Sequence, residues 1–158
     1  MAWVNEGAST SAQLWSRESQ DELHHTVTCD SAVLALTVDN VRGRMLVGTQ
    51  QGDIRVWNLH TFQVQADLVG HHSSVLSLVL SDDYVFSASS DSTVRVWDAE
   101  TLQPRACVFP ASTNTGDIYS LAWDAEAQVL YFGCQDTSIE WISITPERLQ
   151  EAACEPLW

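Results

Sequence analysis

The chain has 158 residues, of which 45 % are hydrophobic and 18 % charged, a composition typical of one globular domain with a sizeable core. Its 21 acidic and 7 basic residues give a formal net charge of −14. So few basic residues argue against binding to nucleic acid or to an anionic membrane, because both need patches of lysine and arginine. No apolar run reaches the length of a transmembrane helix.

Residues 1–20 are rich in small and polar residues and show no clear periodicity. We expect a partly ordered leader here, and an outer strand that joins a neighbouring sheet is the alternative. The repetitive part of the chain is expected over residues 21–144, and a short end segment over residues 145–158.

A first repeat is predicted over about residues 23–69. Four runs of strand-forming residues follow one another there, separated by turn residues. They are Val33–Leu36, Met45–Gly48, Ile54–Asn58 and Phe62–Leu68.

A second repeat, over about residues 70–110, begins with Gly-His and contains Trp-Asp at 97–98. Leucines at every second position from 76 to 80 predict a strand with one buried face. Turn residues at 82–83 and 90–92 separate this strand from two more, at 84–88 and 93–97, and a fourth is expected near 105–109.

A third repeat, over about residues 111–144, begins with a polar loop and continues with strands near 118–123, 129–133 and 138–142. Ile142 occupies the position of Trp97. Trp141 lies one residue earlier and is therefore expected between sheets or at an exposed rim. Thr145-Pro146-Glu147 then predicts a helix that runs to about residue 153.

The repeats share one spacing. Val33, Val75 and Ile118 are 42 and 43 residues apart, and Trp57 and Trp97 are 40 apart. Units of about 40–45 residues with four short strands are typical of WD repeats, each of which forms one blade of a β-propeller. We therefore predict an all-β WD-repeat β-propeller with about three four-stranded antiparallel blades, hence incomplete, and a short C-terminal helix.

The second repeat carries the polar residues that hold WD blades together. By resemblance to that family, a buried hydrogen-bond chain is expected from His71 through Ser89, with Ser87 as the alternative, to Asp91 and Trp97. A Ser-His-Asp grouping also suggests hydrolysis, but a serine bonded to an indole inside a blade has no room for a substrate. Trp57 and Asp136 are the equivalent structural residues of the other repeats, where the chain is incomplete.

No catalytic, metal-binding or cofactor-binding residue is predicted. The cysteines at 29, 107, 134 and 154 form no CxxC pair, and the histidine pairs at 24–25 and 71–72 have no partner at metal-ligand spacing. With no signal peptide at the start, free thiols and a cytoplasmic location are expected.

Closed propellers have about 4–8 blades, so three blades leave an unpaired sheet edge and an uncovered apolar face. We expect the sequence to be a fragment whose remaining blades lie in missing sequence, with three side-by-side sheets in an open arc.

Three stretches resemble one fungal family more specifically. DIYSLAW and FGCQDTS, at residues 117–123 and 132–138, resemble its third blade, and the order DELHH, SAVLAL, MLVGTQQGDIRVW at residues 21–57 resembles its first. These proteins join an N-terminal WD propeller to an aminoacylase/carboxypeptidase-like metallopeptidase domain and belong to the cytosolic glutathione-degrading (defective in utilisation of glutathione) complex.

The resemblance implies a protein-interaction platform that works with a glutamine-amidotransferase-like subunit in hydrolysis of the γ-glutamyl bond of glutathione. It implies zinc only in a downstream peptidase domain, so no cofactor is expected in this chain and no catalytic residue is transferred to it. An unrelated WD adaptor or scaffold, such as a substrate receptor, is the alternative, and an enzyme in its own right is a third reading.

Overall fold

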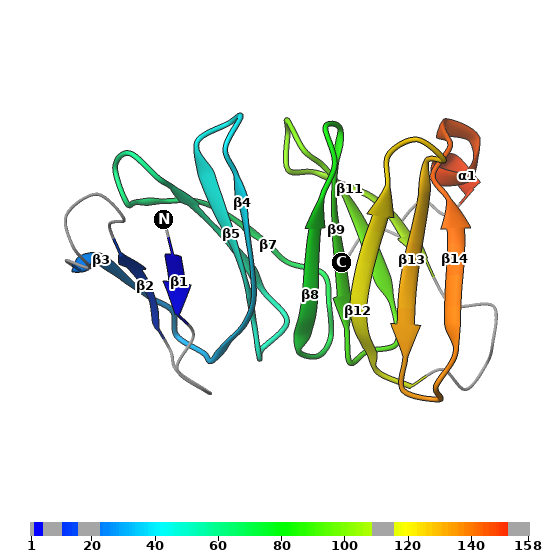
Figure 1. Cartoon of the computed structure of the whole chain (residues 1–158), viewed down its shortest axis with the longest axis horizontal. Helices are drawn as coiled ribbons and strands as arrows, with labels where there is room; N and C mark the ends of the chain where they lie inside the picture. Colours follow the sequence, from blue (N-terminus) through cyan, green and yellow to red (C-terminus); the bar gives the residue numbers. More distant parts are fainter. Residues whose placement is uncertain (1, 5–10, 16–22, 109–115, 152–158) are drawn as a thin grey trace.

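The computed structural model describes residues 2–4, 11–15, 23–108 and 116–151, and in them the chain forms four antiparallel sheets that stand side by side in an open arc (Figure 1). Each sheet presents one face to its neighbour. The all-β WD-repeat prediction is confirmed, and so is the incomplete, open propeller.

The first and second blades are four-stranded sheets in which consecutive strands pair as antiparallel neighbours. The first consists of β4 Val33–Asp39, β5 Arg44–Thr49, β6 Ile54–Asn58 and β7 Val64–Leu68. The second consists of β8 Val75–Leu80, β9 Tyr84–Ser89, β10 Val94–Asp98 and β11 Pro104–Val108.

The third blade contains three strands in the described residues, β12 Ile118–Asp124, β13 Val129–Cys134 and β14 Ile139–Ser143. Instead of a fourth strand, the chain turns at Thr145 into helix α1, Pro146–Glu151. The hydroxyl of Thr145 accepts a bond from the amide of Arg148, and proline fits the first helical turn, so the local sequence favours a helix here. The end of the predicted helix, at 152–153, lies outside the described residues.

An additional sheet lies before the first blade. It consists of β1 Ala2–Val4, β2 Ser11–Trp15 and β3 Leu23–Thr28, in the order β1-β2-β3. The predicted leader, residues 1–20, therefore contains two strands. The first blade begins at Val33 and not near residue 23, because β3 pairs with β2 and leaves β4 as the first strand of the next sheet.

The same irregularity recurs in all three blades. The pairing between the first and second strand shifts by one residue just after Val33, Val75 and Ile118. A bulge at one place in each sheet twists the strand in the same way each time. The repeat read from sequence spacing is therefore also a repeat of backbone geometry.

The core lies between the sheets, because alternate side chains of each strand face the adjacent sheet. Between the first and second blades it contains Ile54, Val75, Val85 and Trp97 among others. Between the second and third it contains Phe86, Ile118, Leu130 and Phe132, with Leu149 of α1. These side chains are at most 9 % exposed, so each blade depends on its neighbour.

The outer face of the third blade carries aromatic and aliphatic side chains in solvent. Trp141 pairs with Tyr131 across β13 and β14, and the two residues are 63 % and 39 % exposed, while Ile139 is 76 % exposed. Trp141 thus lies at an exposed surface, one of the two positions that the sequence allowed.

Candidate functional site

A buried polar network occupies the second blade, centred on His71 in the segment between β7 and β8. The Nδ1 atom of His71 lies 3.0 Å from Oδ2 of Asp91, and its Nε2 atom lies 2.8 Å from Oγ of Ser87. Oγ of Ser87 also accepts a 2.9 Å hydrogen bond from the indole nitrogen of Trp97. The network therefore joins the loop before β8 to β9, to the β9–β10 turn and to β10.

The serine between the histidine and the tryptophan is Ser87, the alternative that the sequence left open, and not Ser89. Trp97 lies opposite the strand position two residues before Ser87, so Ser87 is its diagonal neighbour on the same face. Ser89 lies further along β9, where its Oγ accepts the amide of Asp91 and donates to the carbonyl of Ser73, both at 3.0 Å. Strand register distinguishes the two serines, and periodicity alone places both on one face.

The Asp91 carboxylate is held by several donors. Oδ1 accepts bonds of 2.6 and 3.0 Å from the hydroxyl and amide of Thr93, and Oδ2 accepts a 2.9 Å bond from the amide of His72. Burial acts to raise the pKa of Asp91, but hydrogen bonds from His71 and Thr93 outweigh it and hold the pKa well below its usual range. The Asp91 carboxylate is therefore ionised, and its hydrogen bonds fix the β9–β10 turn.

The arrangement resembles a catalytic Ser-His-Asp triad but lacks access. Ser87 is fully buried and His71 is 6 % exposed. The serine oxygen already accepts the indole N–H of Trp97, so it is not free to attack a substrate. We interpret the network as one that holds the blade together.

Gly70 precedes the histidine because the backbone passes close to the end of this network. A Cβ atom at Gly70 would lie 2.7 Å from Nη1 of Arg95 and 3.1 Å from the indole ring of Trp97. A larger residue would require the guanidinium of Arg95 and the indole of Trp97 to shift. Glycine before the histidine thus lets the loop pack closely against these side chains.

The first blade has the tryptophan but lacks an acceptor for it. Val47 stands in β5 where Ser87 stands in β9, since Arg44–Thr49 and Tyr84–Ser89 are equivalent strands. The buried Nε1 atom of Trp57 has no hydrogen-bond partner among the described residues. A buried donor without an acceptor lowers stability, whereas the indole of Trp97 in the second blade has Ser87 as its acceptor.

The third blade keeps only the turn aspartate. Oδ1 of Asp136 accepts bonds of 2.9 and 2.6 Å from the amide and hydroxyl of Ser138, and these bonds lower the pKa of Asp136. Phe132 and Ile142 occupy the positions of Ser87 and Trp97, and Asp136 is exposed. The structure therefore does not bring Asp136 into a buried network.

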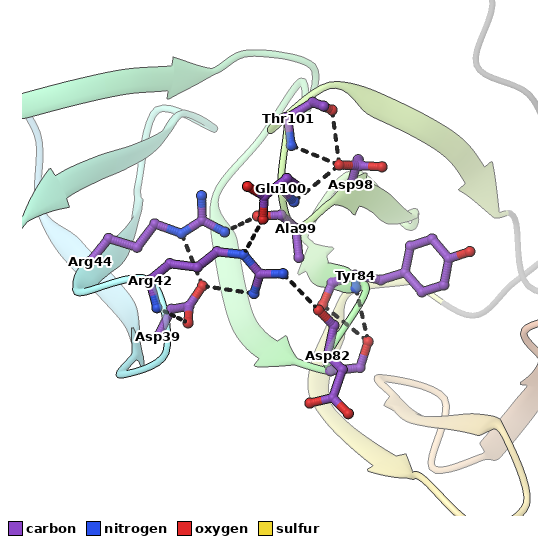
Figure 2. Close-up of polar contacts among 10 residues, drawn as sticks. Asp39, Arg42, Arg44, Asp82, Tyr84, Asp98, Ala99, Glu100 and Thr101 are labelled. Carbon is purple, nitrogen blue, oxygen red and sulfur yellow. Dashed lines mark hydrogen bonds and ion pairs between the residues drawn. The ribbon is translucent and has the colours of Figure 1, made fainter.

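A second polar cluster joins the first and second blades (Figure 2). Arg44 donates from Nε to Oδ2 of Asp39 at 3.0 Å and from Nη2 to the carbonyl oxygen of Ala99. Arg42, in the β4–β5 turn, donates from Nε to Oε2 of Glu100 at 2.8 Å. It also donates to the carbonyl oxygen of Asp82 at 3.0 Å, so two arginines of one blade bind the turns of the next.

Within that cluster, Asp39 and Arg44 are each only 5 % exposed. Burial acts to raise the pKa of Asp39, but the backbone amide of Arg42 and the charge of Arg44 outweigh it, so this pKa is lowered. The pKa of Arg42 is raised, chiefly by its bond to Glu100. Both arginines thus have their charge balanced inside the cluster. The sequence analysis did not identify these residues, because the contact depends on how two blades are placed.

A groove of about 670 Å³ lies beside the cluster, between the β4–β5, β8–β9 and β12–β13 turns. These turns lie along one edge of the arc, the upper edge in Figure 1. Apolar side chains from three blades line it, including Leu80, Tyr84 and Trp123, together with the exposed acidic residues Asp82 and Asp83. No sequence motif indicated it, because its walls come from turns about 40 residues apart.

The part of the chain that the structure describes contains neither a metal-binding cluster nor a membrane-spanning helix. No group of three or more His, Cys, Asp or Glu side chains there is placed to hold a metal ion. The side chains of His24 and His25 lie outside that part. Among the same residues, no helix has the length and apolar character needed to span a bilayer.

One segment of the chain matches a known repeat family, and longer stretches are similar to individual proteins. Residues 62–98 match the WD domain, G-beta repeat family. A rice (Oryza sativa subsp. japonica) protein, Zinc finger CCCH domain-containing protein 17, is 36% identical over 118 residues, which are 72% of this chain and 26% of that protein. Probable di- and tripeptidase DUG2 of Saccharomyces cerevisiae is 26% identical over 152 residues, which are 85% of this chain and 17% of that protein. The chain thus spans about a quarter or less of the length of these two relatives.

Among solved structures, the crystal structure of the computationally designed Ika4 protein superposes with a TM-score of 0.73 at 23% identity. The superposition covers 87% of this chain and 82% of Ika4, which at this identity supports the fold alone. The match over residues 62–98 and the repeated blade geometry therefore show a WD40 repeat in that segment and the fold of an incomplete β-propeller for the chain.

Proposed function

We propose that this chain is the non-catalytic, WD-repeat interaction part of a glutathione-degrading assembly in the cytoplasm. The observation that carries the proposal is the likeness over 152 residues to a yeast protein described as a probable di- and tripeptidase. WD40 repeats indicate a platform for protein partners, and the match over residues 62–98 supports that general role.

The chemistry of such an assembly would lie outside these 158 residues. The Ser-His-Asp grouping of the second blade is sealed in its core, and no set of metal ligands converges in the described residues. In this proposal a peptidase-like domain supplies zinc and a glutamine-amidotransferase-like subunit is the partner. Together they hydrolyse the γ-glutamyl bond of glutathione, while the blades hold the parts in place.

A WD adaptor of an unrelated assembly is the second candidate. It is favoured by the rice zinc-finger protein, which matches at higher identity over 118 residues although its name describes no peptidase. A shared propeller supports shared architecture and leaves the biochemical role to the sites placed on it. The coding sequence of the full transcript separates the two candidates, since only the first predicts a metallopeptidase domain in the same polypeptide.

The direct test is complex formation. The 158-residue chain and the glutamine-amidotransferase-like subunit of the same organism are purified, and their association is measured by calorimetry and size-exclusion chromatography. We expect a complex and no turnover of glutathione by the chain alone. Hydrolysis of glutathione by the isolated chain would overturn the non-catalytic role, and failure to bind the subunit would overturn the assembly.

A further inference from the structure

The groove between the three hairpin turns has a fixed apolar wall. The rings of Phe86 and Trp123 pack with centroids 5.1 Å apart, and those of Tyr84 and Phe86 with centroids 6.1 Å apart. Phe86 is fully buried, so it supports both outer rings from below. Tyr84 and Trp123, with Leu80, line the groove as partly exposed side chains. This wall suits an aliphatic stem or an apolar side chain.

The turn that contributes Leu80 and Tyr84 to this wall also carries negative charge. Asp82 and Asp83 are both exposed in the β8–β9 turn, and neither carboxylate forms an ion pair with a described residue. The nearby cation, Arg42, is already held by Asp39 and Glu100 and binds only the backbone oxygen of Asp82. The groove therefore presents two carboxylates whose charge the cluster beside them does not neutralise.

We propose that this groove binds a linear segment of a protein partner that carries a lysine or arginine beside an apolar residue. The stem of the basic side chain lies along Leu80, Tyr84 and Trp123, and its charged end meets Asp82 and Asp83. A long side chain with an apolar stem and a cationic end complements both the apolar wall and the two carboxylates. This inference rests on the proposed interaction role and assigns it a surface and a partner chemistry.

The negative charge of the groove and of the chain favours a basic occupant over the alternatives. A phosphate-bearing ligand would be repelled by the two carboxylates and by a chain of net charge −14. A second copy of the chain is disfavoured by the same net charge, and its arginines at 42, 44, 55 and 105 are engaged in ion pairs of their own. A basic segment is the occupant that gains from both the charge and the apolar wall.

The test begins with selection of random nonapeptides displayed on phage against the immobilised chain. The most enriched peptide is synthesised, and its affinity is measured by fluorescence anisotropy. We expect enrichment of lysine or arginine next to an apolar residue. We also expect the Asp82→Asn/Asp83→Asn variant to bind the peptide about fivefold or more weakly, with a smaller salt dependence.

The matched control is Asp30→Asn/Asp53→Asn, which removes the same charge from the β3–β4 loop and the β5–β6 turn at the opposite edge of the arc. It should bind like the wild type. Thermal unfolding checks that both variants fold, which is expected because the β8–β9 turn engages Arg42 and Ala99 through the backbone oxygens of Asp82 and Asp83.

Three results with the chain and the peptide overturn the proposal: no enrichment of basic residues, equal weakening by the two double variants, or self-association of the chain that Asp82→Asn/Asp83→Asn abolishes. The last result would make the occupant a second copy. An amidotransferase-like subunit that binds wild type and Asp82→Asn/Asp83→Asn equally would refute the groove and leave the proposed function intact. If the subunit does not bind but the peptide selection gives the expected result, the proposed function is refuted and the groove proposal stands.

Discussion

The hydroxyl of Ser87 accepts the indole hydrogen of Trp97 at 2.9 Å, and both side chains are almost completely withdrawn from solvent. The same hydroxyl contacts Nε2 of His71 at 2.8 Å. One oxygen therefore serves two buried nitrogen atoms. Because the carboxylate of Asp91 only accepts, a neutral His71 carries its proton on Nδ1, and its Nε2 then accepts from Ser87.

Removal of that hydroxyl should be costly. Ser87→Ala leaves Trp97 and His71 each with an unmatched polar atom, and we expect the free energy of unfolding to fall by about 1–3 kcal/mol. Urea unfolding followed by tryptophan fluorescence measures it. The control is Ser90→Ala in the adjoining turn, which should change stability by less than about 0.5 kcal/mol. Equal effects of the two substitutions would contradict the network.

The acid sensitivity of the blade should depend on Asp91. Its pKa is lowered in the folded state, so its stabilising contribution is present above the unfolded pKa of about 3.9 and is lost as pH falls toward the folded value. We expect Asp91→Asn to be less stable than the wild type at neutral pH. The difference should narrow as pH falls below about 4.

Urea midpoints across pH 2–7 measure this, with Asp30→Asn as the control because Asp30 is exposed and has only a long ion pair to Arg55. A difference between wild type and Asp91→Asn that does not change with pH would show that the carboxylate charge is not the stabilising feature.

His71→Ala should lower the free energy of unfolding by a few kcal/mol, on the order of other broken buried networks.

The first blade offers a gain-of-contact test. Val47→Thr keeps a branched side chain and brings a hydroxyl to the position equivalent to Ser87, within the cluster against which Trp57 packs. The new hydroxyl can accept from the orphaned Nε1 of Trp57. We expect a change in stability within about 1 kcal/mol, since the new bond offsets the burial of the hydroxyl.

The same exchange at Val96, which is fully buried in the second blade, is the comparison. Val96 lies in an apolar cluster with Phe86, Val94 and Ala106, so Val96→Thr buries a hydroxyl among apolar side chains and should cost about 1–3 kcal/mol. Thermal and urea unfolding give both values. Similar losses at the two positions would indicate that Trp57 does not use the new acceptor.

The junction between the first two blades should be most sensitive at its buried ion pair. Arg44→Met leaves Asp39 buried without its main partner, and we expect a loss on the order of 3 kcal/mol. Arg42→Gln removes the exposed pair with Glu100 and a 3.4 Å contact with Asp39, which keeps its bond to Arg44, so it should cost about 1 kcal/mol or less. The double variant Asp39→Leu/Arg44→Met should be more stable than Arg44→Met alone, because no unpaired charge is left. A double variant that is no more stable than Arg44→Met would contradict this explanation.

The repeat itself could be predicted from the sequence. Alternating apolar residues, turn residues and a spacing of 40–43 residues are local features, and they located the strands from Val33 to Ser143 and the helix start at Thr145. These features depend on residues close together in the sequence, where backbone preference and hydrophobic period act directly. The placement of His71, Asp91 and Trp97 in one buried network followed from the resemblance to WD repeats, and the structure shows that network.

What the tertiary structure decided depends on register and on the contacts between sheets. The period of two places Ser87 and Ser89 on one face, and only the pairing of β9 with β10 brought Ser87 to the indole. The Arg42–Glu100 bridge and the groove at Trp123 arise from segments separated by tens of residues. The two strands within residues 2–15 form by pairing with each other and with β3, in a segment without clear periodicity. Such contacts depend on how whole sheets pack, and composition and spacing do not specify that geometry.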